Sequence, residues 1–420
     1  MSNVSKRRVV VTGMAGISPL GNDWPTIRAR LGEYRNAVQH MQDWVAYEGL
    51  NTQLGAPAAP FELGKRYDRK SIRSMGRVAL LATRATEMAL VDAGLLDHPI
   101  LKSGRVGVSF GSSAGTPSAI GDFGRMMEER TTRGINATTY IKMMAHTAPV
   151  NIGVFFGVTG RVITTSSACT SGSQGIGYAF EAIQSGKQVA MIAGGAEELD
   201  ATEAAVFDTL FATSTRNDRP ESSPSPFDAG RDGLVIGEGA GCLILEEREH
   251  ALARGATIHA ELVGFGTNSD GTHVTQPNAA TMRQAMELAL ADAGLSAEAI
   301  GYVNAHGTAT AQGDLAESQA TNAVFGSRMP ISSLKSYMGH TLGACGALEA
   351  WISIEMMREG WFAPTLNLNE VDPACGELDY IRGEGRRLEC EYVMTNNFAF
   401  GGINTSLIFK RHPYINKENT

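Results

Sequence analysis

A nine-residue pattern occurs twice in this chain, 200 positions apart. "EMALVDAGL" covers residues 87–95 and "ELALADAGL" covers residues 287–295. Each copy is followed by a strand-like run and a turn of small residues, "VGVSFGSSAGT" after the first and "IGYVNAHGTAT" after the second. Two chance helices with a common Ala-Gly-Leu ending would not share this downstream context. The sequence therefore predicts two related halves, residues 1–253 and 254–420.

Short Val/Ile-rich runs such as "RRVVVTG" and "QVAMIAGG" alternate with helical patterns throughout the chain. This alternation is typical of a layered α/β protein. The first half is the longer one, and its excess lies mainly at residues 110–150 and 205–235. We expect these two segments to form part of a pocket or an interface.

Composition excludes several classes of protein. The net charge of −8 argues against nucleic acid as a partner, because binding phosphates requires clustered positive charge. No apolar run reaches the roughly 18 residues that a membrane span needs, and the N-terminal Val-rich run is typical of a strand rather than a secretion signal. The five cysteines show no paired spacing, so we expect free thiols. A cytoplasmic protein without a membrane span is predicted.

One cysteine lies in an unusual setting, within "TTSSACTSGSQGIGYAFEAI" at residues 164–183. Cys169 is predicted at a turn between a strand and a helix. Amide groups at the start of a helix and the helix dipole favour negative charge there, so we expect a stabilised thiolate and an activated nucleophile. The alternative is a small buried residue, which is the usual role of cysteine.

Two histidines strengthen the first interpretation. His306 follows a predicted strand in "NAHGTATAQGD", and His340 precedes a Gly/Ala-rich helix in "SSLKSYMGHTLGACGALEA". By its approach to a helix, the second stretch is the repeat counterpart of the Cys169 turn, so the duplication should bring His340 and Cys169 to facing helices. The histidines lack the close spacing of a zinc site, and Asp314 and Glu317 fall on a separate helical stretch. No metal site is predicted.

These motifs together resemble the beta-ketoacyl-[acyl-carrier-protein] synthases of the elongating type. The resemblance rests on "SSACTSGSQGIG", "RDGLVIGEGAG", "YVNAHGTAT", "SSLKSYMGHTLGA" and "NNFAFGGIN", in the family's order, and it covers nearly the whole chain. It implies a thiolase-like fold, with two duplicated α/β halves in a layered αβαβα arrangement. It also implies decarboxylative Claisen condensation of malonyl-carrier with an acyl group on the enzyme, which lengthens that chain by two carbons.

The resemblance also implies roles for individual residues. Cys169 corresponds to the family's nucleophile, and its backbone amide and that of Phe400 correspond to the oxyanion hole. His306 and His340 would hydrogen-bond the malonyl thioester oxygen as neutral imidazoles, with Lys335 nearby. We expect Lys335 and a carboxylate such as Glu317 to tune these imidazoles, or else to form a purely structural ion pair. No cofactor is implied beyond the phosphopantetheine that carries the substrates.

Substrate contacts follow from the same resemblance. Thr308 and Thr310 would hydrogen-bond the pantetheine arm, although satisfying their own turn is an alternative role. Phe400 would act as the gate. The expected substrate pocket further includes three aromatic residues, Phe207, Phe211 and Phe398, and large neighbours such as Leu210 suggest a specialised acyl pocket.

The carrier protein is acidic, so its partner surface should be basic. "GKRYDRKSIRSMGR" is predicted as a helical stretch with several cations on one side, although pairing with Glu62 and Asp68 is the alternative. The predicted docking residues are Lys65, Arg66, Arg69, Lys70, Arg73 and Arg216. The family is dimeric, which implies a homodimer, or a heterodimer with a related subunit.

The chain departs from the family pattern at the gate and in the acyl pocket. Ala399 replaces a glycine and would be strained at positive φ, Ile403 replaces a threonine, and Leu234 replaces a phenylalanine. A dedicated secondary-metabolite elongase is therefore an alternative. A non-catalytic partner subunit would lack the cysteine. A thiolase would require a second active-site cysteine in the final glycine-rich loop. That loop has none, and the only candidate near His340 in the sequence is Cys345.

Overall fold

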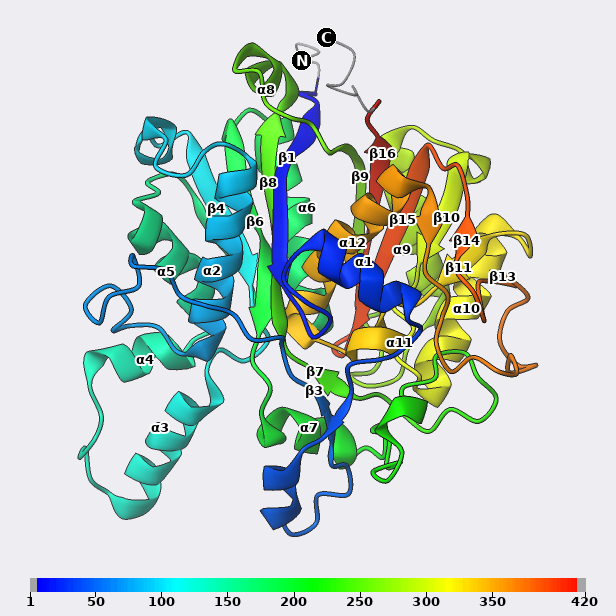
Figure 1. Cartoon of the computed structure of the whole chain (residues 1–420), viewed down its shortest axis with the longest axis horizontal. Coiled ribbons are helices and arrows are strands. Elements are labelled where there is room, and N and C mark those ends of the chain that lie inside the picture. Colours follow the sequence, from blue (N-terminus) through cyan, green and yellow to red (C-terminus); the bar gives the residue numbers. More distant parts are fainter. Residues whose placement is uncertain (1–5, 414–420) are drawn as a thin grey trace.

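The computed structural model describes residues 6–413, which contain a mixed sheet of eleven strands and two small sheets, with helices packed on both faces of the large sheet (Figure 1). The strand order is β13-β11-β10-β15-β16-β9-β1-β8-β6-β4-β5. In the first half of the chain the strands are β1 (Val9–Ile17), β4 (Val106–Gly111), β5 (Val162–Thr165), β6 (Ala190–Glu197) and β8 (Gly239–Glu247). In the second half they are β9 (Ala260–Ser269), β10 (Ile300–Asn304), β11 (Pro330–Ser332), β13 (Asp379–Tyr380), β15 (Tyr392–Ala399) and β16 (Ile403–Arg411).

The two halves repeat one topology. In the first, β1 pairs antiparallel with β8, β8 antiparallel with β6, and β6 and β4 continue in parallel to β5. In the second, β9 pairs antiparallel with β16, β16 antiparallel with β15, and β15 and β10 continue in parallel to β11. β1 and β9 join the halves through a short antiparallel ladder. The predicted duplication is therefore present in the fold, while the division after residue 253 stays a prediction.

The repeated nine-residue pattern lies on equivalent helices, α2 (Arg77–Asp92) and α9 (Ala279–Ala293). A Cβ atom on Gly13 of β1 would lie 2.3 Å from the carbonyl oxygen of Ala89 in α2. A Cβ atom on Gly264 of β9 would lie 2.4 Å from the carbonyl oxygen of Ala289 in α9. The same close contact between a helix backbone and a strand glycine thus explains why the pattern recurs.

Helices occupy three layers. α6 (Ser171–Gln184) and α12 (Cys345–Glu359) pack against each other and against strands of both halves, so they form the central layer (Figure 1). Outside the sheet, α2 and α5 (Thr147–Phe156) cover the first half, and α9 and α10 (Ala311–Phe325) cover the second. This is the expected αβαβα arrangement. The central helices are rich in glycine and alanine because a Cβ atom on Gly172 would lie 2.9 Å from the carbonyl oxygen of Gly343.

The extra length of the first half forms peripheral structure. α3 (Pro117–Glu129) and α4 (Ala137–Met143) project at the lower left of Figure 1. Residues 205–235 include the end of α7 (Ala201–Asp208) and a loop that reaches the pocket described below. The remaining short helices are α1 (Trp24–Gly32), α8 (Arg248–Ala253) and α11 (Lys335–Met338), and short strands are β2 (Gln39–His40), β3 (Leu54–Ala56), β7 (Ile236–Gly237), β12 (Trp361–Phe362) and β14 (Arg386–Arg387). Within residues 6–413, no helix combines the length and apolarity of a membrane span.

Candidate active site

Cys169 lies in the turn that leads from β5 into α6, as the sequence predicts. The hydroxyl residues around it hold this turn together: the Thr170 hydroxyl donates to the carbonyl of Ser167, and the Ser171 hydroxyl accepts from the Ser167 amide. Ala168, directly before the cysteine, has a φ of 51°. The equivalent residue before α12, Leu342, has a φ of 46°. The two halves therefore share one strained elbow, and that of the first half carries the thiol.

His340 is held in place by the backbone. Its amide donates to the carbonyl of Val235 at 2.7 Å, and its carbonyl accepts from the amide of Gly237 at 2.8 Å. The amide of Leu342 donates to Nδ1 of the ring at 3.3 Å. Because Nδ1 accepts this bond, the neutral ring carries its proton on Nε2. That Nε2 atom lies 2.9 Å from Sγ of Cys169.

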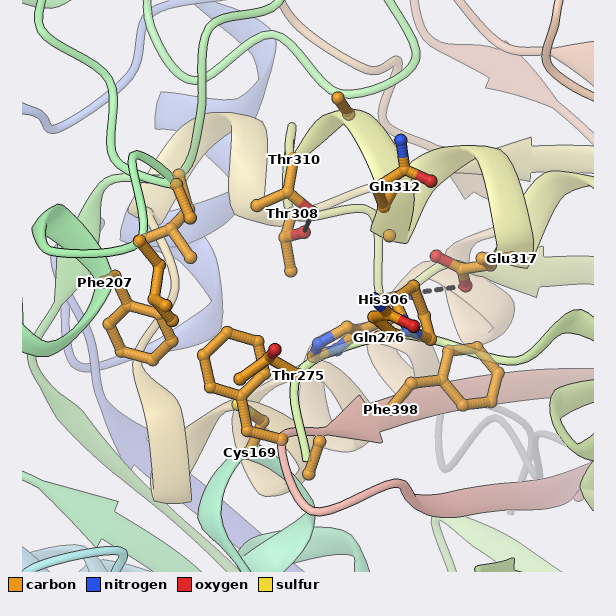
Figure 2. A pocket seen from close by; sticks show the side chains of 18 of the residues that line it. Cys169, Phe207, Thr275, Gln276, His306, Thr308, Thr310, Gln312, Glu317 and Phe398 are labelled. Carbon is orange, nitrogen blue, oxygen red and sulfur yellow. Dashed lines mark hydrogen bonds between the residues drawn. The ribbon is translucent and has the colours of Figure 1, made fainter. Parts of the chain in front are cut away.

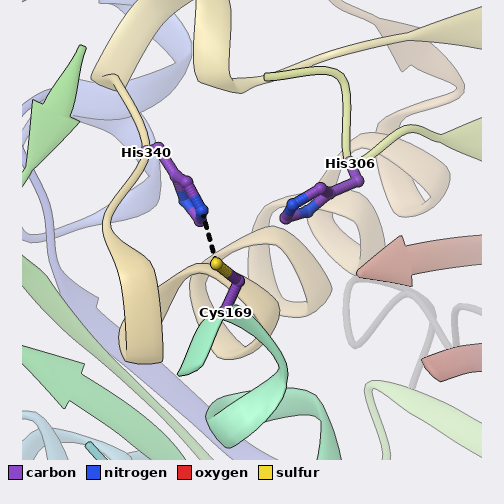
Figure 3. Close-up of side chains that lie close together, drawn as sticks. All are labelled: Cys169, His306 and His340. Carbon is purple, nitrogen blue, oxygen red and sulfur yellow. Dashed lines mark hydrogen bonds between the residues drawn. The ribbon is translucent and has the colours of Figure 1, made fainter. Parts of the chain in front are cut away.

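His306 follows β10 and is fixed by a buried carboxylate. Glu317 of α10 accepts from the amides of His306 and Gly307, each at 2.7 Å. The rings of His306 and His340 lie edge to face with centroids 5.1 Å apart. Both imidazoles point toward Cys169 (Figure 3). Glu317 therefore positions the turn that carries His306 and does not contact the ring of His340.

The ligand atoms of Cys169, His306 and His340 lie within 4.8 Å of one another, which is also a geometry that could hold a metal ion. The sequence analysis grouped these residues but predicted no metal site, because their spacing along the chain is not that of metal ligands; the fold brings them together from both halves. The charge of Lys335 opposes protonation of both imidazoles, and a metal cation at the same place would meet the same repulsion. The arrangement favours chemistry at the thiol.

The expectation of a stabilised thiolate is wrong for the resting site. Burial raises the pKa of Cys169 to about 12, because the charged form loses its hydration. The charge of Lys335 and hydrogen bonds from the amides of Phe400 and Cys169 lower the pKa, but they do not offset the burial. Both amides that the resemblance assigns to an oxyanion hole therefore face the sulfur, while the resting group is a thiol.

Both imidazoles are neutral at pH 7. Burial lowers the pKa of His306 and that of His340 well below the usual value, and the charge of Lys335 lowers both further. Lys335 is itself fully buried, and its Nζ lies 2.5 Å from Oε1 of Glu349. Burial lowers the pKa of Lys335, but the charge of Glu349 together with the smaller effects of Cys345, of the Glu349 hydrogen bond and of Glu317 raises the pKa above its usual value.

Glu349, on α12, was missed by the sequence analysis, which named Glu317 as an example of a carboxylate that tunes the imidazoles. Its second oxygen accepts from Nδ2 of Asn397 at 2.8 Å, and this amide lies 3.5 Å from Nδ1 of His306. One signal could have identified it: Glu349 is a lone carboxylate in the otherwise apolar helical run "CGALEAWIS".

The carboxyl group of Glu317 is also affected by its surroundings, since burial raises its pKa to about 8.

A pocket of about 450 Å³ opens above the cysteine (Figure 2). It brings together most of the predicted site, with Lys335 buried behind it. The lining includes Cys169, His306, His340, Thr308, Thr310, Phe207, Phe211, Phe398 and Phe400. The hydroxyls of Thr308 and Thr310 lie 2.9 Å apart, and the rings of Phe207 and Phe400 have centroids 5.0 Å apart. Phe211 is 89% exposed, so it lies at the mouth and does not narrow an enclosed channel.

At the gate, the alanine that departs from the family pattern causes no backbone strain. Ala399 is the last residue of β15 and is not among the residues with positive φ. The positive angles fall on Gly401 and Gly402, at 89° and 69°. Leu234 is buried in one apolar cluster with Cys169 and Phe207, where it lines the pocket. The Ala399 side chain is thus tolerated because the chain turns two residues later.

The helix predicted for "GKRYDRKSIRSMGR", residues 64–77, is wrong except at its last residue. This stretch forms turns, because the carboxylate of Asp68 accepts from the amides of Lys70 and Ser71 and closes a single turn. α2 begins only at Arg77. Side chains at the predicted positions Lys65, Arg66, Arg69, Lys70 and Arg73 are all exposed.

Two predicted docking residues have partners that the sequence did not indicate. Arg66 forms ion pairs with Asp97 and Glu87 rather than with Glu62 or Asp68. Arg216 lies 3.4 Å from Asp232 and donates to the carbonyl of Ser222. The exposed cations Lys65, Arg69 and Lys70 have no ion-pair partner within residues 6–413.

Comparison with known proteins gives a consistent result over the full chain. The sequence models described as "Beta-ketoacyl synthase, N-terminal domain" and "Beta-ketoacyl synthase, C-terminal domain" match residues 6–251 and 259–369. A 3-oxoacyl-[acyl-carrier-protein] synthase 2 from Vibrio harveyi is 37% identical over 97% of this chain and 99% of its own.

Solved structures agree. A beta-ketoacyl synthase from Burkholderia phymatum has a TM-score of 0.96 and 61% identity, over 97% of this chain and all of its own. A type II polyketide ketosynthase, bound to a hexaketide and in complex with its acyl-carrier protein, has a TM-score of 0.84 and 29% identity over 97% of this chain and all of its own. In this chain, all five cysteines are free thiols, as the sequence analysis expects.

Proposed function

This chain belongs to the beta-ketoacyl synthase family, and from that membership and the geometry above we propose that it is an elongating 3-oxoacyl-[acyl-carrier-protein] synthase. It condenses malonyl-carrier with an acyl group held on Cys169 and releases carbon dioxide. The observation that carries this proposal is the 2.9 Å contact between Sγ of Cys169 and Nε2 of His340, beside the ring of His306 in a shared pocket.

The first step is acyl transfer. Sγ of Cys169 attacks the thioester carbonyl of the acyl-carrier, a carbon–sulfur bond forms, and the carrier's pantetheine leaves with the thiol proton. The oxygen that becomes negative in this step lies next to the sulfur. The amides of Cys169 and Phe400, which face the sulfur in the resting site, are placed to donate to it.

The second step is decarboxylative condensation. The carbon–carboxylate bond of malonyl-carrier breaks, carbon dioxide leaves, and the electron pair forms an enolate on the thioester oxygen. The enolate carbon attacks the acyl carbonyl on Cys169, and the cysteine sulfur leaves and takes up a proton. His306 and His340 are neutral and donate N–H bonds to the enolate oxygen, while burial and Lys335 prevent their protonation.

The rival functions have less support. A thiolase would use a second reactive cysteine in the final glycine-rich loop, but Cys345 begins α12 and its thiol donates to the carbonyl of Cys169 at 3.2 Å. A non-catalytic subunit would not retain Cys169 and both histidines. The polyketide ketosynthase is less similar in sequence to this chain than the Vibrio harveyi synthase is, so the elongating synthase is the favoured function.

We propose acyl carrier protein as the partner, docked on the exposed cations Lys65, Arg69 and Lys70. Because the whole chain carries a net charge of −8, attraction of an acidic carrier needs such a local patch. Thr308 and Thr310 line the pocket and are placed to hydrogen-bond the pantetheine arm. Their mutual hydrogen bond shows that both hydroxyls are oriented by the turn.

We also propose that the chain assembles as a homodimer. β5 is an edge strand of the large sheet, and Val162 on it is 50% exposed. Met127 of α3, Tyr140 of α4 and Val154 of α5 add exposed apolar side chains in the same part of the chain. An unprotected edge strand beside exposed apolar groups is typical of an interface.

The Cys169→Ala variant tests the assignment. Intact mass should show an acyl adduct on the wild type after incubation with acyl-carrier and none on the variant. Replacing the carrier thioesters by coenzyme A thioesters should slow both loading and condensation. A normal adduct on the variant, or equal rates with coenzyme A, would contradict the proposed function.

A further inference from the structure

One buried carboxyl group on α7 has no hydrogen-bond partner among the described residues. Glu203 lies in the first turn of α7 and is only 7% exposed. Neither of its carboxyl oxygens has a hydrogen-bond partner among residues 6–413. Its acidic neighbours differ in this respect: Glu197 accepts from the amide of Gly343, and Glu238 pairs with Arg77. A buried polar group without a partner is costly, so its retention indicates a ligand that supplies one.

Glu203 does not itself line the pocket, but it lies on α7, the helix that contributes Phe207 to the pocket wall. It precedes Phe207 by one helical turn, so the two side chains are on the same face of α7. Phe207 and Ala204 share one apolar cluster with Cys169.

The surroundings select the kind of group that Glu203 can bind. Burial, and then the negative charges of Glu197, Glu198 and other acidic neighbours, raise the pKa of Glu203 well above its usual value. The carboxyl is therefore neutral and can both donate and accept a hydrogen bond. Among residues 6–413, Glu203 belongs to no set of side chains with metal-ligand geometry. Nearby negative charge favours a partner that donates, and burial disfavours a charged one.

We propose that Glu203 is a specificity residue that hydrogen-bonds a hydroxyl group on the acyl chain carried by Cys169. The preferred substrates are then hydroxyacyl thioesters rather than alkanoyl thioesters of the same length. The bound chain passes Phe207 and reaches Glu203 about 6 Å closer to the N-terminus of α7, the rise over four residues. This inference rests on the proposed function, because it requires an acyl group on Cys169.

The test compares loading of Cys169 by carrier-bound alkanoyl and hydroxyalkanoyl chains of equal length, with the hydroxyl moved along the chain. The wild type should load one hydroxyacyl isomer about tenfold faster than the alkanoyl chain. Glu203→Leu should remove this preference by slowing hydroxyacyl loading. Glu203→Gln has the same shape and retains a hydrogen-bonding amide, so it should keep part of the preference. Val206→Ala, at an exposed position of the same helix, is the matched control and should keep all of it.

Each contrary outcome has its own meaning. If the wild type shows no preference at any hydroxyl position, or if Glu203→Leu keeps the preference, the assignment of Glu203 is wrong. If Glu203→Leu changes the mass of the assembly and not the preference, the carboxyl pairs with a second subunit and the assignment is again wrong. If neither substrate loads Cys169, the proposed function itself fails.

Discussion

Removing the partner of Lys335 should destabilise the protein severely. The side chains of Lys335 and Glu349 are 1% and 0% exposed, so water cannot solvate a charge left alone there. Glu349→Gln keeps the shape of the side chain but leaves the Lys335 ammonium group buried without a counter-charge. Breaking a buried ion pair in this way costs about 3–5 kcal/mol. The free energy of unfolding, measured by denaturant titration, should fall by that amount.

A matched control lies on the surface. Arg283 and Glu287 form an ion pair on α9 with side chains about half exposed. Because water screens this pair, Glu287→Gln should change the free energy of unfolding by less than about 0.5 kcal/mol. Equal losses in the two variants would refute the argument from burial.

A double variant separates the structural role of the pair from its electrostatic role. Lys335→Met with Glu349→Leu replaces both charges by apolar groups, and stability should return to within about 1 kcal/mol of the wild type. Condensation should stay at least about tenfold slower, a barrier increase of about 1.4 kcal/mol, because the charge that favours the Cys169 thiolate is gone. Recovery of both stability and activity would show that the pair is only structural.

Three further outcomes test the proposed roles and assembly. The variants His306→Ala and His340→Ala should still accept an acyl group on the nucleophile but lose malonyl decarboxylation, as carbon dioxide release would show; loss of acylation as well would mean that the roles are wrongly assigned. Reversing Lys65, Arg69 and Lys70 to glutamate should slow reaction with carrier-bound substrate and spare a small pantetheine thioester, with the difference shrinking as salt rises; equal slowing of both would place the docking surface elsewhere. Light scattering at micromolar concentration should give the mass of a dimer, and a monomer mass would contradict the proposed interface.

Much of the fold and of the candidate catalytic cluster could be predicted from the sequence. The repeat on α2 and α9 indicated the duplication, because a helix that packs its backbone on a strand glycine needs the same small residues in each half. The turns around Cys169, His306 and His340 were readable because hydroxyl, glycine and histidine residues define such turns locally. The sequence alone thus determined the two-half architecture and the three residues at its centre.

Only the tertiary structure decided the pKa values of the site residues and the side chains with which they pair. The local pattern at Cys169 favours a thiolate, but burial by segments far away in the chain raises the pKa of the thiol. The ion-pair partner of Lys335 is Glu349, which the sequence analysis did not name, since a side chain's partners depend on which helices the fold brings together. Likewise, the basic run at residues 65–74 forms turns although its spacing suits a helix. Hydration, charge pairing and close packing depend on distant residues, so a local sequence pattern does not contain them.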